Sequence, residues 1–490
     1  QERGEDGEGT RYEYDWYGNQ IRIFYADGGC ERRFYDPDGN LIKQVMPEAY
    51  DPETDDGAGY TYTYDPMGRL SRIEDPDGNL AHSYRYNGHG QTVWEADGEG
   101  TEHFYEYNGL GLKSRERVGI RKEKDVVFYR VTAYGYDLQG NKVGEAYGQE
   151  EVAGDKDPET WHRISFAYDR DNRLAKVWDE FGAEARYAYD CLGNLTMEEQ
   201  VIEEGIRRHI RYSYNKNGWR VRKEERIQGN GKEVTSAVTC YGYDKAGNLT
   251  KITTPNGYEI RGAYDGDGRL TEERIIDRPN GIDRRENYTY DAAGNLLSET
   301  LEGREGEVIR REYGYDLKDR KIQEKNPQGG IARYLYDRND LLIKEISPYG
   351  YGMDGGKEPG IIYRYDSRGN QIQETNSLGE VVKEKRYNAA NQLVAEIDGM
   401  GNETEFTYLP DGQTRSVSRE NGGQKRQLQN YKYNARGQII GITDGIGETV
   451  NYDVDGWGRI TRIRFSDDVS EGYEYTPAGQ VSRAIDGNGN

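Results

Sequence analysis

Hydrophobic and polar residues alternate along much of this chain. Segments 20–24 (QIRIF) and 459–463 (RITRI) show the alternation, and pairs of the form Tyr-x-Tyr, such as Tyr12 and Tyr14, stand before many such segments. Successive side chains of a β-strand point to opposite faces, so a period of two predicts short strands with both tyrosine rings on one face. No stretch sustains a helical period, and we therefore expect an all-β chain.

A six-residue phrase, Tyr-Asp-x-x-Gly-Asn, separates the strands and recurs along the chain. Thirteen looser copies begin at Tyr64, Tyr86, Tyr107, Tyr168, Tyr214, Tyr264, Tyr315, Tyr336, Tyr387, Tyr408, Tyr433, Val454 and Tyr475. With seven clean copies they make twenty, spaced by 21 to 32 residues. We expect the clean copies to form the structural repeat motif through Tyr14, Asp15, Gly18, Asn19, Tyr35, Asp36, Gly39, Asn40, Tyr136, Asp137, Gly140, Asn141, Tyr189, Asp190, Gly193, Asn194, Tyr243, Asp244, Gly247, Asn248, Tyr290, Asp291, Gly294, Asn295, Tyr365, Asp366, Gly369 and Asn370.

The substitutions among the copies indicate a tight turn. The second position is Asp or Asn in eighteen of the twenty copies, and such side chains bond the backbone two residues further on. The fifth position is Gly in sixteen copies and Asn172, Asp319, Asp340 or Asn391 in the others. Gly, Asn and Asp tolerate positive φ, so we predict left-handed backbone there, in a hairpin loop that closes through a bulge.

A second turn follows each alternating segment, as in Asp75-Pro76-Asp77-Gly78-Asn79. Each repeat is therefore two strands and two turns, and the longer spacings, for example 198–210, 224–238 and 272–285, predict lengthened hairpins. Twenty repeats predict about forty strands, or roughly 190 Å of sheet at about 4.8 Å per strand. Because large open sheets twist and curl, we expect a long antiparallel sheet that spirals into a hollow β-solenoid shell.

Composition restricts the partners and the core. Only 34% of the 490 residues are hydrophobic, 43 are tyrosine and the net charge is −23. The acidic balance argues against nucleic acid and against an anionic membrane surface as partners. No apolar run approaches the roughly 18 residues that a spanning helix needs, so we expect no insertion of this segment into a membrane. Too few aliphatic residues are present for a two-layer core, so we expect one shell domain over 1–490, an excerpt of a longer protein, whose tyrosines pack a half-wetted wall.

Candidate chemistry is weak throughout. The turns at Asp36 and Asp75 could offer oxygens to calcium, but their glycines fall at the wrong place for an EF-hand loop, and turn formation explains them. The nearest histidines, His82, His89 and His103, carry no zinc spacing, and no nucleophile elbow, Walker loop or dinucleotide fingerprint occurs. We expect no catalytic residues, no metal and no cofactor, and hence no enzyme.

The repeated phrase at a spacing near 21, with a second turn midway, resembles the RHS/YD-repeat family over residues 10–490. The resemblance implies a β-sheet cocoon, which in bacterial RHS proteins and toxin-complex components encapsulates a C-terminal toxin and in animal teneurins is part of an adhesion protein. The conserved core segment that precedes the toxin has no match here. Residues 471–480 are ordinary repeat, so neither self-proteolysis nor toxin activity is carried over.

Our leading hypothesis is a bacterial, exported shell, secreted or at the cell surface, that encloses or carries a polypeptide cargo or the flanking domains of its own protein. The alternative is an extracellular adhesin or fibre that binds cell-surface carbohydrate, a receptor or another chain. Tyrosine rings on a rigid sheet could stack sugars, but their coupling to the turn motif favours packing of the wall itself.

Overall fold

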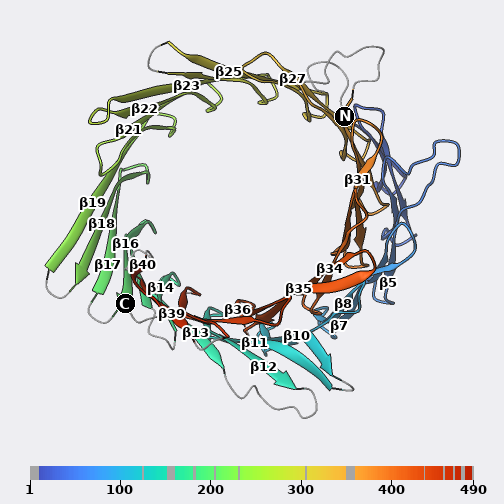
Figure 1. The fold of residues 1–490 in the computed structure, drawn as a ribbon, viewed down its shortest axis with the longest axis horizontal. Helices are drawn as coiled ribbons and strands as arrows, with labels where there is room; N and C mark the ends of the chain where they lie inside the picture. Colours follow the sequence, from blue (N-terminus) through green and yellow to red (C-terminus); the bar gives the residue numbers. More distant parts are fainter. Residues whose placement is uncertain are drawn as a thin grey trace. The chain divides into compact units, whose positions relative to one another are not determined.

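The computed structural model describes residues 10–123, 126–151, 161–179, 184–203, 206–229, 232–303, 306–348, 359–434, 436–455, 458–466, 469–475 and 481–487. Every element in these ranges is a β-strand, and the forty strands form one antiparallel sheet. Consecutive strands pair with each other in chain order, so the ribbon can be followed hairpin by hairpin (Figure 1). The predictions of an all-β chain and of about forty strands are confirmed.

The repeat motif sets the bounds of the strands. The first strand of each repeat ends at the first motif position: β1 Arg11–Tyr14, β3 Cys30–Tyr35, β5 Tyr60–Tyr64, β7 Leu80–Tyr86, β9 Glu102–Tyr107, β11 Val126–Tyr136, β13 His162–Tyr168, β15 Glu184–Tyr189, β17 Ile206–Tyr214, β19 Lys232–Tyr243, β21 Glu259–Tyr264, β23 Ile282–Tyr290, β25 Val308–Tyr315, β27 Ile331–Tyr336, β29 Ile361–Tyr365, β31 Val381–Tyr387, β33 Glu403–Tyr408, β35 Gln424–Tyr433, β37 Thr449–Val454 and β39 Ser470–Tyr475.

The second strand of each repeat begins directly after the six-residue phrase, at the seventh position: β2 Gln20–Phe24, β4 Leu41–Val45, β6 Leu70–Glu74, β8 Thr92–Asp97, β10 Lys113–Glu123, β12 Lys142–Glu151, β14 Leu174–Asp179, β16 Leu195–Glu203, β18 Arg220–Gly229, β20 Leu249–Thr253, β22 Leu270–Asp277, β24 Leu296–Glu302, β26 Lys321–Lys325, β28 Leu342–Ile346, β30 Gln371–Thr375, β32 Leu393–Asp398, β34 Thr414–Asn421, β36 Ile439–Asp444, β38 Ile460–Arg464 and β40 Val481–Ile485.

The turn between these two strands has the predicted backbone. In the first repeat Gly18 has a φ of 89°, and the pairing register shifts between Glu13 and Tyr14, which marks a bulge. The four fifth positions that are not glycine (Asn172, Asp319, Asp340, Asn391) have φ between 59° and 67°. Left-handed geometry is thus confirmed at nineteen of the twenty fifth positions; the twentieth, Gly479, lies outside the described residues.

The stretches 198–210, 224–238 and 272–285 form long hairpins, as predicted, whereas the spacing of 29 residues between Tyr35 and Tyr64 comes from a long turn between β4 and β5. Strands β16 and β17 pair from Met197 to Glu203, and β18 and β19 pair over most of their length. A strand extended by four or five residues stays in the same sheet because its alternation continues unbroken. The insertions therefore change the length of strands or of turns and not the order of the sheet.

Contacts divide the chain into two compact units. Unit 1 comprises 1–105, 290–298 and 310–427, and unit 2 comprises 106–289, 299–309 and 428–490. The apolar core is thin, and its most deeply buried side chains include Val45 and Ile346 in unit 1 and Val131 in unit 2. Among the described residues no helix is long and apolar enough to span a membrane.

Candidate functional site: the turns and edges of the repeat sheet

The motif turn, which we define as positions two to six of each repeat, is closed by its own carboxylate. In the second repeat, Asp36 Oδ1 accepts hydrogen bonds from the backbone N–H groups of Asp38 and Asn40, and Asp36 Oδ2 accepts one from the Asn40 amide. These donors lower the pKa of Asp36. The carboxylate that could have faced calcium thus satisfies the turn instead.

The seven clean copies occupy equivalent places. Their tyrosines are the last residues of β1, β3, β11, β15, β19, β23 and β29, and their aspartates begin the following turns. In all seven, the sixth-position asparagine donates its side-chain amide to the aspartate. Where the sixth residue is arginine, as in Arg69 and Arg173, its guanidinium replaces that amide. Motif residues therefore meet within each repeat and form no common site.

The tyrosine at the first position joins each repeat to the one before it. Tyr35 Oη donates to the Gln20 carbonyl at 3.1 Å, and Tyr64 Oη donates to the Leu41 carbonyl at 2.8 Å. The acceptor is each time the seventh residue of the preceding repeat, just before the stretch that pairs with the next strand. The same bond is made by fifteen of the motif tyrosines. Fixed spacing of a phenol and a turn signals such a bond, but its acceptor is visible only in the structure.

The non-glycine fifth positions make a second bond between repeats. Asn391 Oδ1 accepts from the Asn370 amide at 2.9 Å, and Asn172 Oδ1 accepts from the Asn141 amide at 3.1 Å. Asp319 and Asp340 accept from the sixth residues of their own preceding repeats in the same way. Asn and Asp at these positions therefore combine left-handed geometry with an acceptor that glycine lacks.

One face of the sheet carries tyrosines and carboxylates. Tyr84 lies opposite Glu95 and Tyr334 lies opposite Glu345 in the pairing register. The hydroxyl of Tyr105, from the next repeat, donates to Glu95 at 2.6 Å. Burial and the neighbouring glutamates raise the pKa of the wall tyrosines Tyr134 and Tyr363 to about 12. This fits the predicted wall, in which rings pack on neighbouring strands and hydroxyls reach polar groups.

The sequence signal for this carboxylate row is a glutamate at the tenth position, which occurs in ten of the twenty copies and was not recognised from the sequence. The ten are Glu95, Glu116, Glu145, Glu198, Glu273, Glu299, Glu324, Glu345, Glu374 and Glu396. In the last four copies the position holds Val417, Ile442, Ile463 and Ala484.

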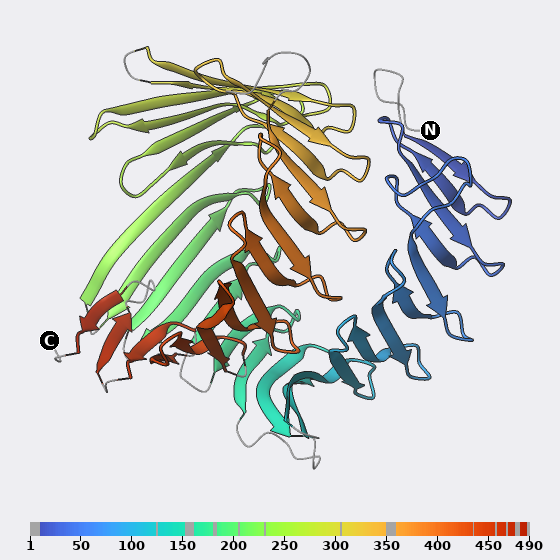
Figure 2. The same ribbon diagram turned by 45° about the vertical axis from the view of Figure 1, so that its right-hand side comes forward.

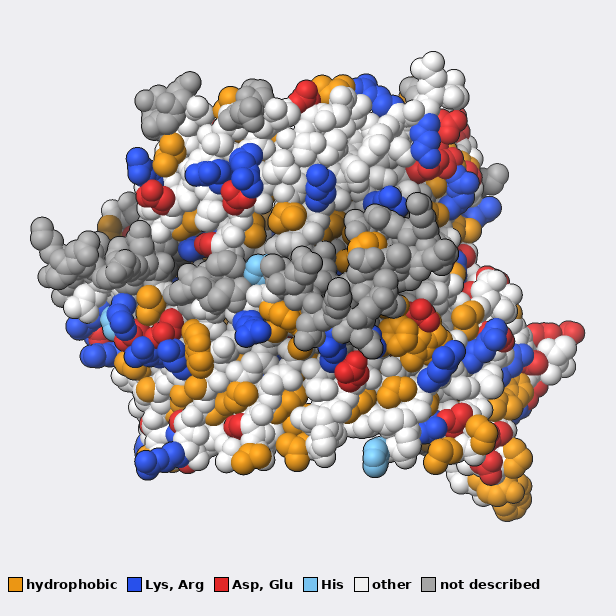
Figure 3. Space-filling view, turned by 90° about the horizontal axis from the view of Figure 1, so that it is seen from below, with side chains coloured by type: hydrophobic (Ala, Val, Ile, Leu, Met, Phe, Trp, Pro, Cys, Tyr) orange, Lys and Arg blue, Asp and Glu red, His pale blue; other side chains and the backbone are white. Residues whose placement is uncertain are grey.

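The opposite face carries mixed charges. Glu184 bridges Lys176 and Arg186, and Arg85 stacks on the Trp94 ring at 4.2 Å. Acidic, basic and hydrophobic side chains are interspersed on the face shown in Figure 3. Half-exposed pairs of this kind contribute little stability each, about 0–1 kcal/mol. The face is a solvated surface without one dominant charge.

Within unit 1, two segments about 290 residues apart in sequence meet by their turns. We name residues 10–105 the early segment and residues 310–427 the later segment; their blue and orange turns face each other in Figure 2. Lys318, in a motif turn of the later segment, donates to Asp27 Oδ2 at 3.1 Å and lies 4.6 Å from the centroid of the Tyr25 ring. Against the effect of burial, hydrogen bonds from Gly29 N–H and Lys318 lower the pKa of Asp27.

Three further contacts repeat this arrangement along the line where the early and later segments meet, which we call the seam. Each joins the turn between two repeats, here called the second turn, in the early segment to a motif turn of the later segment. They are Glu48 with Asn339 and Arg338, Asp77 with Ser367, and Glu99 with the backbone N–H of Ala389. An acidic oxygen is the acceptor in all but the first of these bonds, where the Asn339 amide accepts.

The repeat spacing explains why the contacts recur. Motif tyrosines of the early segment stand at 14, 35, 64 and 86, and those of the later segment at 315, 336, 365 and 387. The two sets differ by 301 throughout, and even the long second turn after β4 has a counterpart after β28. Each early repeat therefore meets a later repeat of the same dimensions.

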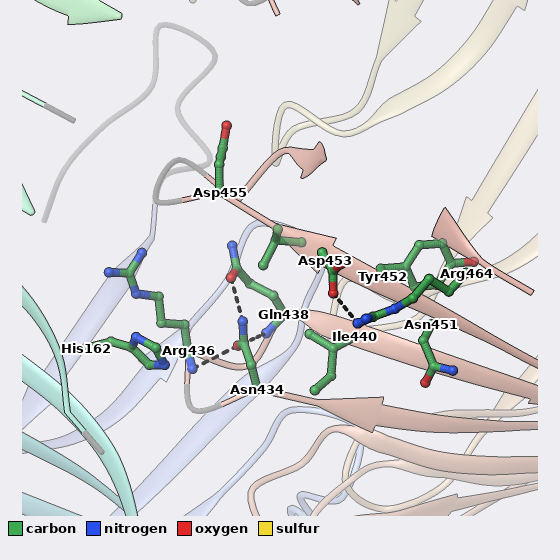
Figure 4. A pocket seen from close by; sticks show the side chains of 11 residues that line it. His162, Asn434, Arg436, Gln438, Ile440, Asn451, Tyr452, Asp453, Asp455 and Arg464 are labelled. Atoms are coloured by element: carbon green, nitrogen blue, oxygen red, sulfur yellow. Dashed lines mark hydrogen bonds and ion pairs between the residues drawn. The ribbon is translucent and has the colours of Figure 1, made fainter. Parts of the chain in front are cut away.

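Unit 2 has a contact at a similar separation but with a pocket beside it. The Arg436 guanidinium lies 5.8 Å from the centroid of the Tyr147 ring. Around it, a pocket of about 470 Å³ is lined by residues that include His162, Asn434, Gln438 and Asp455 (Figure 4). Asn434 Oδ1 accepts from the backbone N–H groups of Arg436 and Gln438. Its oxygen thus serves the motif turn, as in other repeats.

The remaining candidate residues have local partners. The His82 and His103 rings stack with Tyr84 and Tyr105 at centroid distances of 6.1 and 6.3 Å. No group of three or more His, Cys, Asp or Glu side chains that could hold a metal ion occurs in the described ranges. Cys30 is buried and reduced, and its surroundings raise the pKa of the thiol mainly by burial.

These observations define a tandem β-hairpin repeat protein whose turns join repeats along the chain and, 290 residues apart, across it. The RHS Repeat model matches residues 35–80 and 243–278. The tRNA3(Ser)-specific nuclease WapA of Bacillus spizizenii is 26% identical over 421 residues, which are 84% of this chain and 13% of that protein. Double-stranded DNA deaminase toxin A of Burkholderia cenocepacia is 24% identical over 84% of this chain and 33% of its own length.

The repeats of this chain are RHS/YD repeats, and the chain is similar to members of the RHS/YD-repeat family. It spans a third or less of the length of these relatives. A crystal structure of TcdB2-TccC3-Cdc42 matches 98% of this chain and 28% of that one, at 15% identity and a TM-score of 0.48.

Proposed function

We propose that this chain is a wall segment of an exported YD-repeat shell that encloses or carries a polypeptide cargo. Its contribution is structural, and the segment performs no catalysis of its own. Cargo such as a C-terminal toxin and an extracellular or cell-surface location follow from the relatives, whose names include a nuclease and a toxin.

The observation that carries the proposal is the seam of unit 1. Each strand from β1 onward pairs with the next, and yet second turns of the early segment touch motif turns of the later segment 290 or 291 residues on. A continuously paired sheet that meets itself edge to edge separates two sides of a wall. Such a wall, half wetted and rich in tyrosine, suits confinement of a chain better than binding of a small ligand.

A protection experiment tests this function. A protease-sensitive reporter polypeptide fused after Asn490 should be cleaved at least about tenfold more slowly than the free reporter, and electron microscopy should show density inside closed particles. The same reporter fused before residue 1 serves as the matched control, because it shows how far fusion to the chain by itself slows cleavage. Cleavage at the rate of the free reporter, together with open ribbons, would contradict the shell.

The second candidate is an extracellular fibre or adhesin, and one observation favours it. Trp16 and Tyr17, on the motif turn of the first repeat, are 101% and 86% exposed. Large aromatic side chains on a rigid turn could contact a sugar or another chain. Binding of polysaccharide that is lost in a Trp16→Ala variant would support this candidate.

A further inference from the structure

The strands of each segment of unit 1 end in a row of motif turns on one side and a row of second turns on the other. One of these two rows lies in the seam, and the other, which we call the outer edge, lies away from it. The motif turns of the early segment and the second turns of the later segment lie on these outer edges (Figure 2). Both outer edges expose large apolar side chains. Met67 is 71% exposed on the first, and Leu378 and Met400 are 81% and 89% exposed on the second.

Equivalent positions of the early and later segments differ by 301 residues, so each exposed apolar side chain has a counterpart in the seam. In the seam, Arg368 lies on a later motif turn, 3.9 Å from Asp75, and Met67 is its counterpart on the outer edge. The docking acids Asp77 and Glu99 have Leu378 and Met400 as their counterparts. Three charged groups of the seam are thus exchanged for apolar groups on the outer edges, whereas Asp27 has the polar Gln328 as its counterpart.

We propose that the two outer edges bind each other between copies of this chain. The second turns of the later segment of one copy dock on the motif turns of the early segment of a second copy, in the register of the seam. This register sets Leu378 of one copy against Pro66 of the next, next to Met67, since Asp77 meets Ser367 in the seam. The contact is head to tail, so it can extend to more than two copies.

Continuity with the seam and the chemistry of the edges support this occupant. The seam and the proposed contact have the same direction, because second turns meet motif turns in both. The centres of protein interfaces are depleted of charge, and contiguous exposed apolar groups mark interaction sites. Apolar groups at both outer edges therefore match each other better than either matches the charged residues of the seam.

Sedimentation velocity of the whole chain over a wide concentration range tests the proposal. We expect the wild-type chain to associate, and Met67→Lys and Leu378→Asp each to weaken association by about tenfold or more, because one apolar partner is lost. The double variant should recover most of the affinity, since it places a cation near an acid across the contact. Its association should then weaken with added salt, unlike that of the wild type.

A matched control is Ile362→Lys, which changes a 40% exposed residue on the strand β29 and not on an edge. It should associate like the wild type. A chain that stays monomeric at all concentrations would overturn the proposal and leave the outer edges to other YD repeats. Equal association of all variants, or no recovery in the double variant, would also overturn it. Thermal unfolding of each variant checks that the variant is folded.

Discussion

The seam of unit 1 and the contact of unit 2 both join distant repeats. In unit 1 the described residues form a series of direct bonds across the seam, whereas in unit 2 the described Arg436 guanidinium lies over the Tyr147 ring. In unit 1 the intervals between motif tyrosines are 21, 29 and 22 residues in both segments. In unit 2 the interval from Tyr136 to Tyr168 is 32 residues, whereas that from Tyr433 to Val454 is 21. A pocket of about 470 Å³ lies beside the second contact.

This difference separates two properties of a repeat array. Pairing along the chain tolerates hairpins of different length, because each strand needs only the register of its neighbour. Docking between distant repeats requires that their turns lie opposite each other. It therefore depends on equal intervals between the motif tyrosines of the two distant segments. Variants that alter the seam should therefore cost more than equivalent variants beside the pocket.

The largest effect is expected from Gly98→Ala. A Cβ at this position would lie 2.6 Å from the Ala389 carbonyl oxygen and 2.7 Å from that of Leu80, so backbone must move. Because two backbone carbonyls obstruct the added methyl group, we expect the free energy of unfolding to fall by about 3 kcal/mol. Hydrogen exchange at the Ala389 amide, which donates to Glu99, should quicken. Gly88→Ala is the control, because nothing lies within 4 Å of a Cβ there; equal behaviour of the two variants would contradict close docking.

A smaller effect is expected from Lys318→Met, which keeps the stem of the side chain and removes the ammonium. The Lys318 and Asp27 side chains are 12% and 19% exposed, so Asp27 loses a buried donor, at a cost of about 1–3 kcal/mol in unfolding free energy. Arg436→Met in unit 2 removes the cation–π contact with Tyr147, and we expect it to cost less than Lys318→Met. Urea unfolding measures both, and equal losses would remove the distinction between the contacts.

Acid should weaken unit 1 through Asp55, which closes the long second turn between β4 and β5. Hydrogen bonds from Arg22, with others from Tyr50 and Arg32, lower the pKa of Asp55 to about 2. Because the folded pKa lies below the unfolded value of about 3.9, this stabilisation is complete above pH 4 and is lost as pH falls towards 2.

Thermal unfolding between pH 2 and 6 measures this effect. Asp55→Asn should have a lower Tm than the wild type at pH 6, and the difference should shrink towards pH 2. Asp38→Asn, on an exposed motif turn, is the matched control and should follow the wild type. A constant difference between Asp55→Asn and the wild type would show that the ion pairs do not hold the turn.

The local fold could be predicted from the sequence because its determinants are local. Asp at the second position and Gly, Asn or Asp at the fifth specify a turn within six residues, and alternation specifies the strands. Hence the left-handed geometry of Asn172 and Asp319 and the lengthened hairpin of β16 and β17 were predicted correctly.

The contacts between turns could not be predicted in the same way. The partner of Asp27 is 291 residues away, and acidic turns are too common in this chain to single one out. A signal was present in the equal intervals after Tyr14 and Tyr315, but it gains meaning only when the two stretches are known to touch. The tenth-position glutamates lie outside the six-residue phrase and play no part in its turn, so the motif alone does not point to them.

The smallest effect concerns a device that both units share. Asn391→Ala should lower the unfolding free energy by about 1–2 kcal/mol, since alanine keeps the unfavourable left-handed backbone and loses the bond from Asn370. Asn391→Gly loses the bond but relieves the backbone, so its change should stay below about 1 kcal/mol. Asn172 variants in unit 2 should give the same pair of values, because Asn141 supplies the equivalent donor. Calorimetric unfolding measures the difference in unfolding free energy between the Ala and Gly variants in each unit. Equal differences in the two units would mean that the units differ only in the contacts at their edges. Unequal differences would mean that the bonds between neighbouring repeats also depend on how well distant repeats dock.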